Sequence, residues 1–232
     1  MAFVKVSEVL KLADAANTSA IAFNCVDFNT AHSVIAVAEE LQKPVIIMLY
    51  PGHCIDSNWS TPAAFAPMVI AEANRVKVPV ALHMDHSSDF EYIKAAIDAG
   101  FTSVMYDGSM LSVEENMKNT REICEYAHAH GYYTKTPKLD LDRLQAINAA
   151  TDVPLVLHGG SGIPDDQLEL AFTMGINKFN VGTEFLGLYF KTVCEYAEQF
   201  KNDPKHIILD MAIPVQEALK AYLRKKLELS KL

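Results

Sequence analysis

One arrangement of residues recurs along this 232-residue chain: a short polar step, then a proline, then an almost unbroken apolar run. It appears in the stretches LQKPVIIMLY, VKVPVALHMDH and TDVPLVLHGGS. Proline is tolerated at the first position of a strand, where no ladder hydrogen bond needs its missing N–H. Runs that are apolar at nearly every position are typical of strands covered on both faces, as in parallel sheets. The sequence therefore predicts buried parallel strands.

Helical patterns alternate with these runs, which favours βα units in one α/β fold. We expect six strands, at Ala20–Asn24, Pro44–Tyr50, Pro79–His86, Thr102–Asp107, Pro154–His158 and Ile176–Val181. Among the expected helices, one around Val34 to Leu41 is capped by Asn29 or Thr30, one spans Phe90–Ala99 and ends at Gly100, and one spans Val113–Ala129.

Composition narrows the class of protein. The formal net charge of -9 argues against a nucleic-acid surface. Half of the residues are apolar, which permits a sizeable core, and the length fits a single domain over residues 1–232. The N-terminal stretch reads as an amphipathic helix rather than a signal peptide, and no run is apolar enough to span a bilayer. We therefore expect a cytoplasmic protein with no membrane partner, whose cysteines are reduced.

Ionisable side chains stand where the apolar runs end. His86 and His158 each follow a buried run, and Asp85 precedes His86. The carboxyl ends of parallel strands form the active site in α/β proteins, so these groups are expected to meet there. Two imidazoles from different strands suit a zinc ion, which favours nitrogen ligands. His83 shares strand parity with Asp85, and it either orients that carboxylate or is a buried histidine bonded to the backbone.

Two glycine-containing turns follow the last two expected strands. GGSG covers Gly159 to Gly162, and NVGT covers Asn180 to Thr183. Both open into predicted helices, and backbone N–H groups at such places converge on an oxyanion. The loops after the last two strands are the usual phosphate site of a TIM barrel. The pair of turns therefore predicts a phosphate-binding site.

These motifs resemble a known family. The set AFN, ALHMDH, YDGS, PLVLHGGSG and NVGTE, in this order, is similar to the zinc-dependent class II ketose-bisphosphate aldolases, and especially to their tagatose- and fructose-bisphosphate branch. The resemblance implies a (β/α)8 TIM barrel that cleaves a ketose 1,6-bisphosphate to dihydroxyacetone phosphate and glyceraldehyde 3-phosphate. It also implies a homodimer or homotetramer.

The resemblance assigns roles to individual residues. Asp85 is implied as the catalytic proton donor to the aldehyde oxygen, and His86, His130 and His158 as the zinc ligands. Asn24, His83 and Asp107 are expected to support these groups. A monovalent cation near the phosphate is a further expectation. The residues implied to hold phosphate are Gly131, Gly159, Gly160, Ser161, Asn180, Val181, Gly182 and Thr183.

The match to the family has a gap at about residues 130–133. Family members carry a fifth strand, its helix and a sixth strand there, together with an ELG segment that is thought to supply a proton-transferring glutamate. Either these residues are missing from this sequence or the chain is truly shortened, and the intact flanking motifs favour the first. In AHGYYTKTPKLD, His130 resembles the third zinc ligand, but it also suits the end of the preceding helix, where a histidine favours the helix dipole.

Other functions remain in competition with a metal-dependent aldolase. Lys178 on the last strand could form a Schiff base, which needs no metal. The lost glutamate segment instead favours a catalytically impaired protein that binds sugar phosphates without turnover. A sugar-phosphate epimerase would use similar metal and phosphate sites, but it needs a pair of acid and base groups that the sequence does not show.

Overall fold

The computed structural model describes residues 2–53, 60–129, 141–151, 153–159, 163–202 and 205–232. Its strands are β1 (Ala20–Asn24), β2 (Val45–Leu49), β3 (Val80–Ser87), β4 (Ser103–Tyr106), β5 (Leu155–Leu157) and β6 (Ile176–Val181). Its helices are α1 (Val6–Ala15), α2 (Phe28–Leu41), α3 (Pro62–Ala73), α4 (Phe90–Ala99), α5 (Val113–Ala129), α6 (Leu141–Ala150), α7 (Asp165–Thr173), α8 (Thr183–Phe200) and α9 (Ile208–Glu228), with a 3-10 turn, η1, at Pro51–His53.

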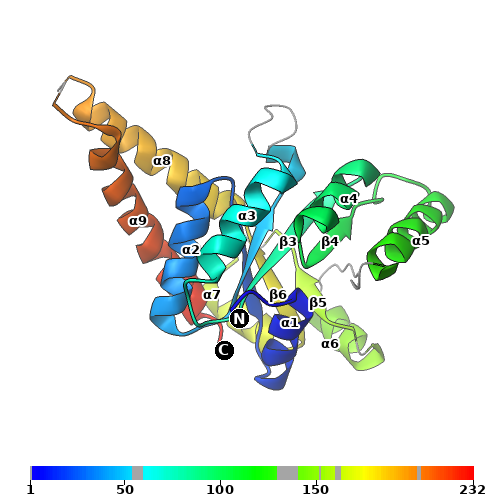
Figure 1. The fold of residues 1–232 in the computed structure, drawn as a ribbon. Helices are drawn as coiled ribbons and strands as arrows, with labels where there is room; N and C mark the ends of the chain where they lie inside the picture. Colours follow the sequence, from blue (N-terminus) through cyan, green and yellow to red (C-terminus); the bar gives the residue numbers. More distant parts are fainter. Residues whose placement is uncertain (1, 54–59, 130–140, 152, 160–162, 203–204) are drawn as a thin grey trace.

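All six described strands join one parallel sheet in the order β4-β3-β2-β1-β6-β5 (Figure 1). Each expected strand is present, and the three that follow a proline begin one residue after it. Every residue of β1, β2 and β6 is buried. Burial on both faces explains why β2 is apolar throughout and why β1 is apolar up to its last residue, Asn24.

The expected closed barrel is wrong for the described residues. β4 and β5 form the two edges of the sheet and do not pair with each other, so the sheet is open. Closure of a small barrel requires strand number, tilt and stagger to be mutually consistent, and these six strands fall short of the eight in a (β/α)8 barrel. The gap between β4 and β5 falls where the sequence analysis places the missing segment, next to residues 130–140, which lie outside the described part.

The two faces of the sheet carry different side chains. Ile21 and Phe23 of β1 pack with the large core beneath the outer helices. Ala20 and Ala22 pack on the other face in a smaller cluster with α1. We call this second face the inner face; it also carries Ile46, Met48 and Ala81. Since α1 covers the amino end of the inner face, the carboxyl end is left for the ionisable groups.

Two helix boundaries show how a single residue can end or begin a helix. Gly100 ends α4 with φ of 101°, a left-handed conformation that glycine adopts at little cost. The cap expected at Asn29 or Thr30 is wrong, because α2 begins earlier, at Phe28. Asp27 is its N-cap and accepts a hydrogen bond from the backbone N–H of Thr30 at 2.8 Å.

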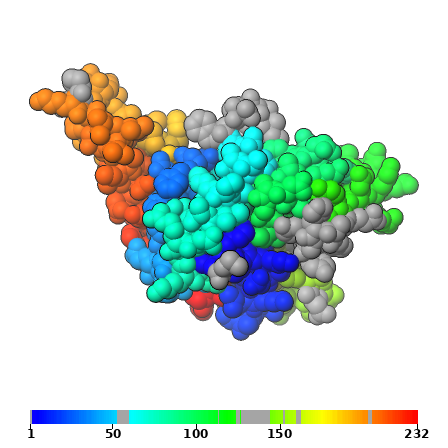
Figure 2. All heavy atoms as spheres, viewed as in Figure 1, coloured from blue at the N-terminus to red at the C-terminus, as the bar shows by residue number. Residues whose placement is uncertain are grey.

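Helices α8 and α9 form an extended pair that reaches away from the sheet, and Figure 2 shows its far end standing out from the rest of the surface. Within the described parts of the chain, no helix is both long and apolar enough to cross a membrane.

Candidate active site

A local irregularity in β3 brings two neighbouring side chains together. Met84 pairs with Val104 of β4, but the next pair joins Ser87 to Tyr106, so β3 carries an extra residue at a bulge. His86 lies in this bulge with φ of 26°. Consecutive side chains of a regular strand point to opposite faces, and the bulge removes this constraint. Asp85 and His86 can therefore face the same site.

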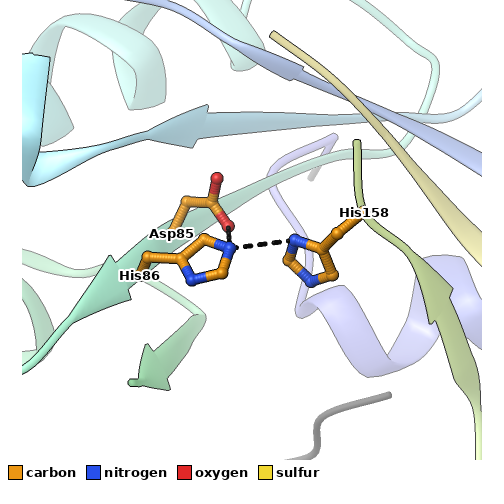
Figure 3. A group of neighbouring side chains, drawn as sticks. All are labelled: Asp85, His86 and His158. Atoms are coloured by element: carbon orange, nitrogen blue, oxygen red, sulfur yellow. Dashed lines mark hydrogen bonds and ion pairs between the residues drawn. The ribbon is translucent and has the colours of Figure 1, made fainter. Parts of the chain in front are cut away.

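His158 completes the cluster from β5, the strand at the opposite edge of the sheet. It follows β5 directly, and Figure 3 shows its ring facing that of His86. His86 Nε2 lies 3.0 Å from His158 Nδ1 and 3.9 Å from Asp85 Oδ1. One ligand atom from each of Asp85, His86 and His158 lies within 4.8 Å of the others, so this group could hold a metal ion.

The second ring nitrogen of His86 faces a carboxylate. His86 Nδ1 lies 2.8 Å from Asp107 Oδ2, just beyond the end of β4. Hydrogen bonds from Ser109 and then from His86 lower the pKa of Asp107 to about 2, against the opposing effect of burial. Asp107 is thus ionised near neutral pH and can only accept, so Nδ1 of His86 donates. In the neutral ring this leaves a lone pair on Nε2, as in a metal-ligating histidine held by a carboxylate.

The His158 ring is neutral near pH 7. Burial, followed by the charge of Lys178, lowers the pKa of its ring to about 4. Its Nδ1 faces both His86 Nε2 and the side-chain amide of Asn180, at 3.0 Å and 3.1 Å. Two nitrogen ligands of a tetrahedral zinc ion, each about 2.0–2.1 Å from the metal, would be roughly 3.3 Å apart. The separation of these two nitrogens and the neutral state of His158 therefore fit a shared metal ion.

Asp85 keeps one buried oxygen free. Its side chain is 5% exposed, and Asn24 donates to Oδ2 at 3.1 Å. Among the residues that the structure describes, Oδ1 has no hydrogen-bond partner, and the same holds for Oδ1 of Asn24 and of Asn180. Buried polar oxygens without partners are costly in a folded protein. Such oxygens at the carboxyl ends of β1, β3 and β6 suit a polar ligand or a metal ion.

The structure gives His83 a contact that neither expectation named. His83 is buried, and its Nδ1 lies 2.9 Å from the hydroxyl of Ser103 on β4. Ser103 is also its register partner across the sheet. The ring is therefore held by a neighbouring strand's side chain, and the contact is neither to Asp85 nor to the backbone.

Lys178 lies beneath the cluster on the inner face. Its residue exposure is 3%, and its Nζ lies 3.4 Å from the sulfur of Met48. Burial lowers the pKa of this amine to about 8, although Asp85 opposes the shift. A Schiff-base lysine must meet the substrate carbonyl. Burial alone does not show such a contact, and the Schiff-base role of Lys178 stays a prediction.

The residues expected to bind phosphate are described only in part. Gly159 adopts φ of 68°, which favours glycine. Asn180 and Val181 end β6, Gly182 is the N-cap of α8 and Thr183 opens that helix. His130, Gly131, Gly160 and Ser161 lie outside the described residues. The described part of α5 ends at Ala129, and both roles expected for His130 stay predictions.

Sequence reasoning missed two supporting residues. Ser109 donates its backbone N–H to Asp107 at 3.0 Å, and Ser103 holds His83. Ser109 is the last residue of the YDGS stretch. Because an aspartate in a turn often accepts from the backbone N–H two residues later, this stretch could have predicted the contact with Asp107. Ser103 carried no sequence signal, because its role depends on the register between β3 and β4.

A family model described as "Fructose-bisphosphate aldolase class-II" matches residues 4–131 and 129–231. The chain belongs to the class II fructose-bisphosphate aldolase family. The two matched stretches of this aldolase meet at residues 129–131, where the sequence analysis places the gap. The family assigns it an aldehyde-lyase activity.

Individual relatives agree with the family. The aldolase is 32% identical to the fructose-bisphosphate aldolase of Geobacillus stearothermophilus over 274 residues, which cover 95% of this chain and 94% of that one. This alignment is longer than the 232 residues of the chain, so the relative contains residues that have no counterpart here. The aldolase is also 33% identical to the 6-phospho-5-dehydro-2-deoxy-D-gluconate aldolase of Halalkalibacterium halodurans, over 80% of this chain and 82% of that one.

A solved structure shows the same likeness. The YdjI aldolase from Escherichia coli K12 superposes with a TM-score of 0.85 at 26% identity, covering 99% of this chain and 97% of that one. The described strands and helices thus superpose on those of a solved aldolase, although the sheet stays open between its two edge strands, β4 and β5.

Proposed function

We propose that this aldolase uses a zinc ion to cleave a ketose 1,6-bisphosphate, of the fructose or tagatose series, to dihydroxyacetone phosphate and glyceraldehyde 3-phosphate. The observation that carries the proposal is the meeting of His86 and His158, 3.0 Å apart, beside a buried carboxylate oxygen of Asp85 that has no hydrogen-bond partner among the described residues. A cytoplasmic location, a single domain over residues 1–232 and a dimeric or tetrameric assembly stay predictions.

In this proposal the metal ligands are His86 and His158, with His130 as the third. When bound, the zinc ion supplies Lewis acidity that stabilises the negative charge developing on the substrate as the C3–C4 bond breaks. Asp107 orients His86 by accepting a hydrogen bond from its Nδ1–H. This contact fixes the His86 ring before the substrate arrives.

Asp85 is proposed to act as the general base and general acid at the C4 oxygen of the substrate. In cleavage its carboxylate accepts the proton of the C4 hydroxyl, and in condensation the resulting acid returns it to the aldehyde oxygen. Asn24 holds Oδ2 at 3.1 Å, which leaves Oδ1 to meet the substrate. The wholly buried β3 residues beneath Asp85 keep this carboxylate in a fixed position.

The phosphate group is proposed to lie at the start of α7 and α8. Gly159, Gly160 and Ser161 precede α7, and Asn180 to Thr183 lead into α8. Helix N-termini present unpaired N–H groups and a positive dipole end to an anion. Anchoring the phosphate there orients the reacting carbons toward the metal and Asp85.

A substrate panel tests the proposal. Fructose 1,6-bisphosphate, tagatose 1,6-bisphosphate and 6-phospho-5-dehydro-2-deoxy-D-gluconate are offered to the purified protein, and release of dihydroxyacetone phosphate is followed. We expect release from one of the two bisphosphates with the highest kcat/KM of the panel. If 6-phospho-5-dehydro-2-deoxy-D-gluconate is turned over faster than both bisphosphates, the protein would instead be assigned the activity by which the Halalkalibacterium relative is named.

The gap between β4 and β5 favours a second candidate. Without the expected glutamate segment, the protein could bind sugar phosphates without turning them over. A folded protein that binds a bisphosphate and releases no product from any compound of the panel would support this second candidate against the first.

A further inference from the structure

Lys226, near the end of α9, touches two other helices at once. Its side chain is 11% exposed, and its Nζ lies 3.3 Å from Asp165 Oδ1 and 3.4 Å from Glu184 Oε2. Asp165 is the first residue of α7, and Glu184 lies in the first turn of α8. A single ammonium group therefore joins the first turns of the two helices that follow GGSG and NVGT.

Tyr222 strengthens the same connection. Its hydroxyl donates to Glu184 Oε2 at 2.7 Å, and its ring is stacked against Phe185 with centroids 6.2 Å apart. The Nζ of Lys226 lies 5.8 Å from the centre of the Tyr222 ring. Burial raises the pKa of Tyr222, so its hydroxyl stays a donor. The Glu184 carboxylate is thus held by two side chains of α9.

The charges in these first turns pose a problem for anion binding. Asp165 and Asp166 open α7, and Glu184 is in the first turn of α8. Acidic residues stabilise a helix N-terminus, but they repel a phosphate dianion that binds at the same end. Lys226 offsets the charge of Asp165 and Glu184 from a position that is mostly shielded from solvent, where screening is weaker.

We propose that Lys226 is a positioning residue for substrate phosphate: it fixes the start of α7 relative to the start of α8 and offsets the carboxylates that would repel the anion. The inference rests on the phosphate site of the proposed function. Lys226 does not have to touch the phosphate, because it acts through Asp165 and Glu184.

The test measures binding of inorganic phosphate by isothermal titration calorimetry to the wild-type protein and three variants. Lys226→Met should raise the Kd about fivefold, since two partly exposed ion pairs are lost and two carboxylates are left uncompensated. Lys226→Arg, which keeps the charge, should stay close to wild type. Lys220→Met is the matched control, because Lys220 lies on the same helix but pairs with Glu217, at 2.9 Å.

Kinetics and a second variant separate positioning from a merely structural role. Lys226→Met should raise KM for the bisphosphate more than it lowers kcat. Asp166→Asn, which removes a carboxylate from the first turn of α7 and keeps both ion pairs of Lys226, should tighten phosphate binding, and this result does not depend on Lys226→Met folding. Wild-type protein that binds no phosphate overturns the proposed phosphate site together with this inference. Equal Kd values for wild type and Lys226→Met, or weaker binding by Asp166→Asn, overturn the inference alone.

Discussion

Replacing Asp85 with Asn should lower kcat for bisphosphate cleavage by about 10²–10⁴-fold, the usual contribution of a general acid–base group. The amide keeps the size of the carboxyl group and its contact with Asn24, but it cannot accept the C4 hydroxyl proton. Bound zinc should stay near the wild-type content, because the two histidine ligands are untouched. Steady-state kinetics and metal analysis of the same preparation measure both quantities.

A conservative change close by provides the control. Asp89 caps α4 just beyond β3 and accepts from the backbone N–H groups of Glu91 and Tyr92. Asn caps helices about as well as Asp, so Asp89→Asn should keep kcat within about twofold of wild type. If Asp85→Asn retains full activity, Asp85 does not carry the proton. If it loses its zinc as well, the carboxylate belongs to the metal site.

Replacing His158 with Ala should remove the metal and the activity together. The variant loses one of the two described imidazole ligands, and its zinc affinity should fall by more than the roughly 10–100-fold that the loss of a supporting residue costs. Asp107→Asn supplies that comparison, since it changes only the group that orients His86. The two affinities are measured by competition with a chromophoric chelator, and the zinc content by mass spectrometry.

A histidine far from the cluster serves as the matched control. His206 lies just before α9 and pairs with Asp210 at 3.4 Å. His206→Ala should keep the full zinc content. A His158→Ala protein with unchanged zinc affinity would show that this ring does not ligate the metal, and would leave its contact with His86 as a structural hydrogen bond.

The strands were predictable because burial leaves a simple signature. β1 and β2 are buried at every position, and such strands read as continuous apolar runs after a turn or a proline. β6 is equally buried but carries Asn177, Lys178 and Asn180, and its position followed from the helical patterns on either side. Gly100 was predictable for a local reason, since a helix often ends on a glycine in the left-handed conformation.

The open sheet could not be predicted by analogy with the family. Barrel closure depends on the number and stagger of all the strands, and the described residues supply six. The cap of α2 was misplaced for a smaller reason. Asp27, Asn29 and Thr30 are all suitable N-cap residues, and only the backbone shows that the helix begins at Phe28.

The candidate site was predictable as a set of residues and not as a geometry. The sequence placed Asp85, His86 and His158 at strand ends, where parallel strands gather their functional groups. It did not show the bulge in β3 that lets Asp85 and His86 face one site, because a bulge is a mismatch between two strands. The contact of His83 with Ser103 depends on the same register.

The most direct measurement is bisphosphate cleavage by the same purified protein before EDTA treatment, after it, and after zinc is restored. We expect activity to be lost with EDTA and to return with zinc, because His86 and His158 are proposed to hold a metal that the reaction needs. Cleavage that persists at the same rate after the metal has been removed, verified by mass spectrometry, would contradict a metal-dependent aldolase.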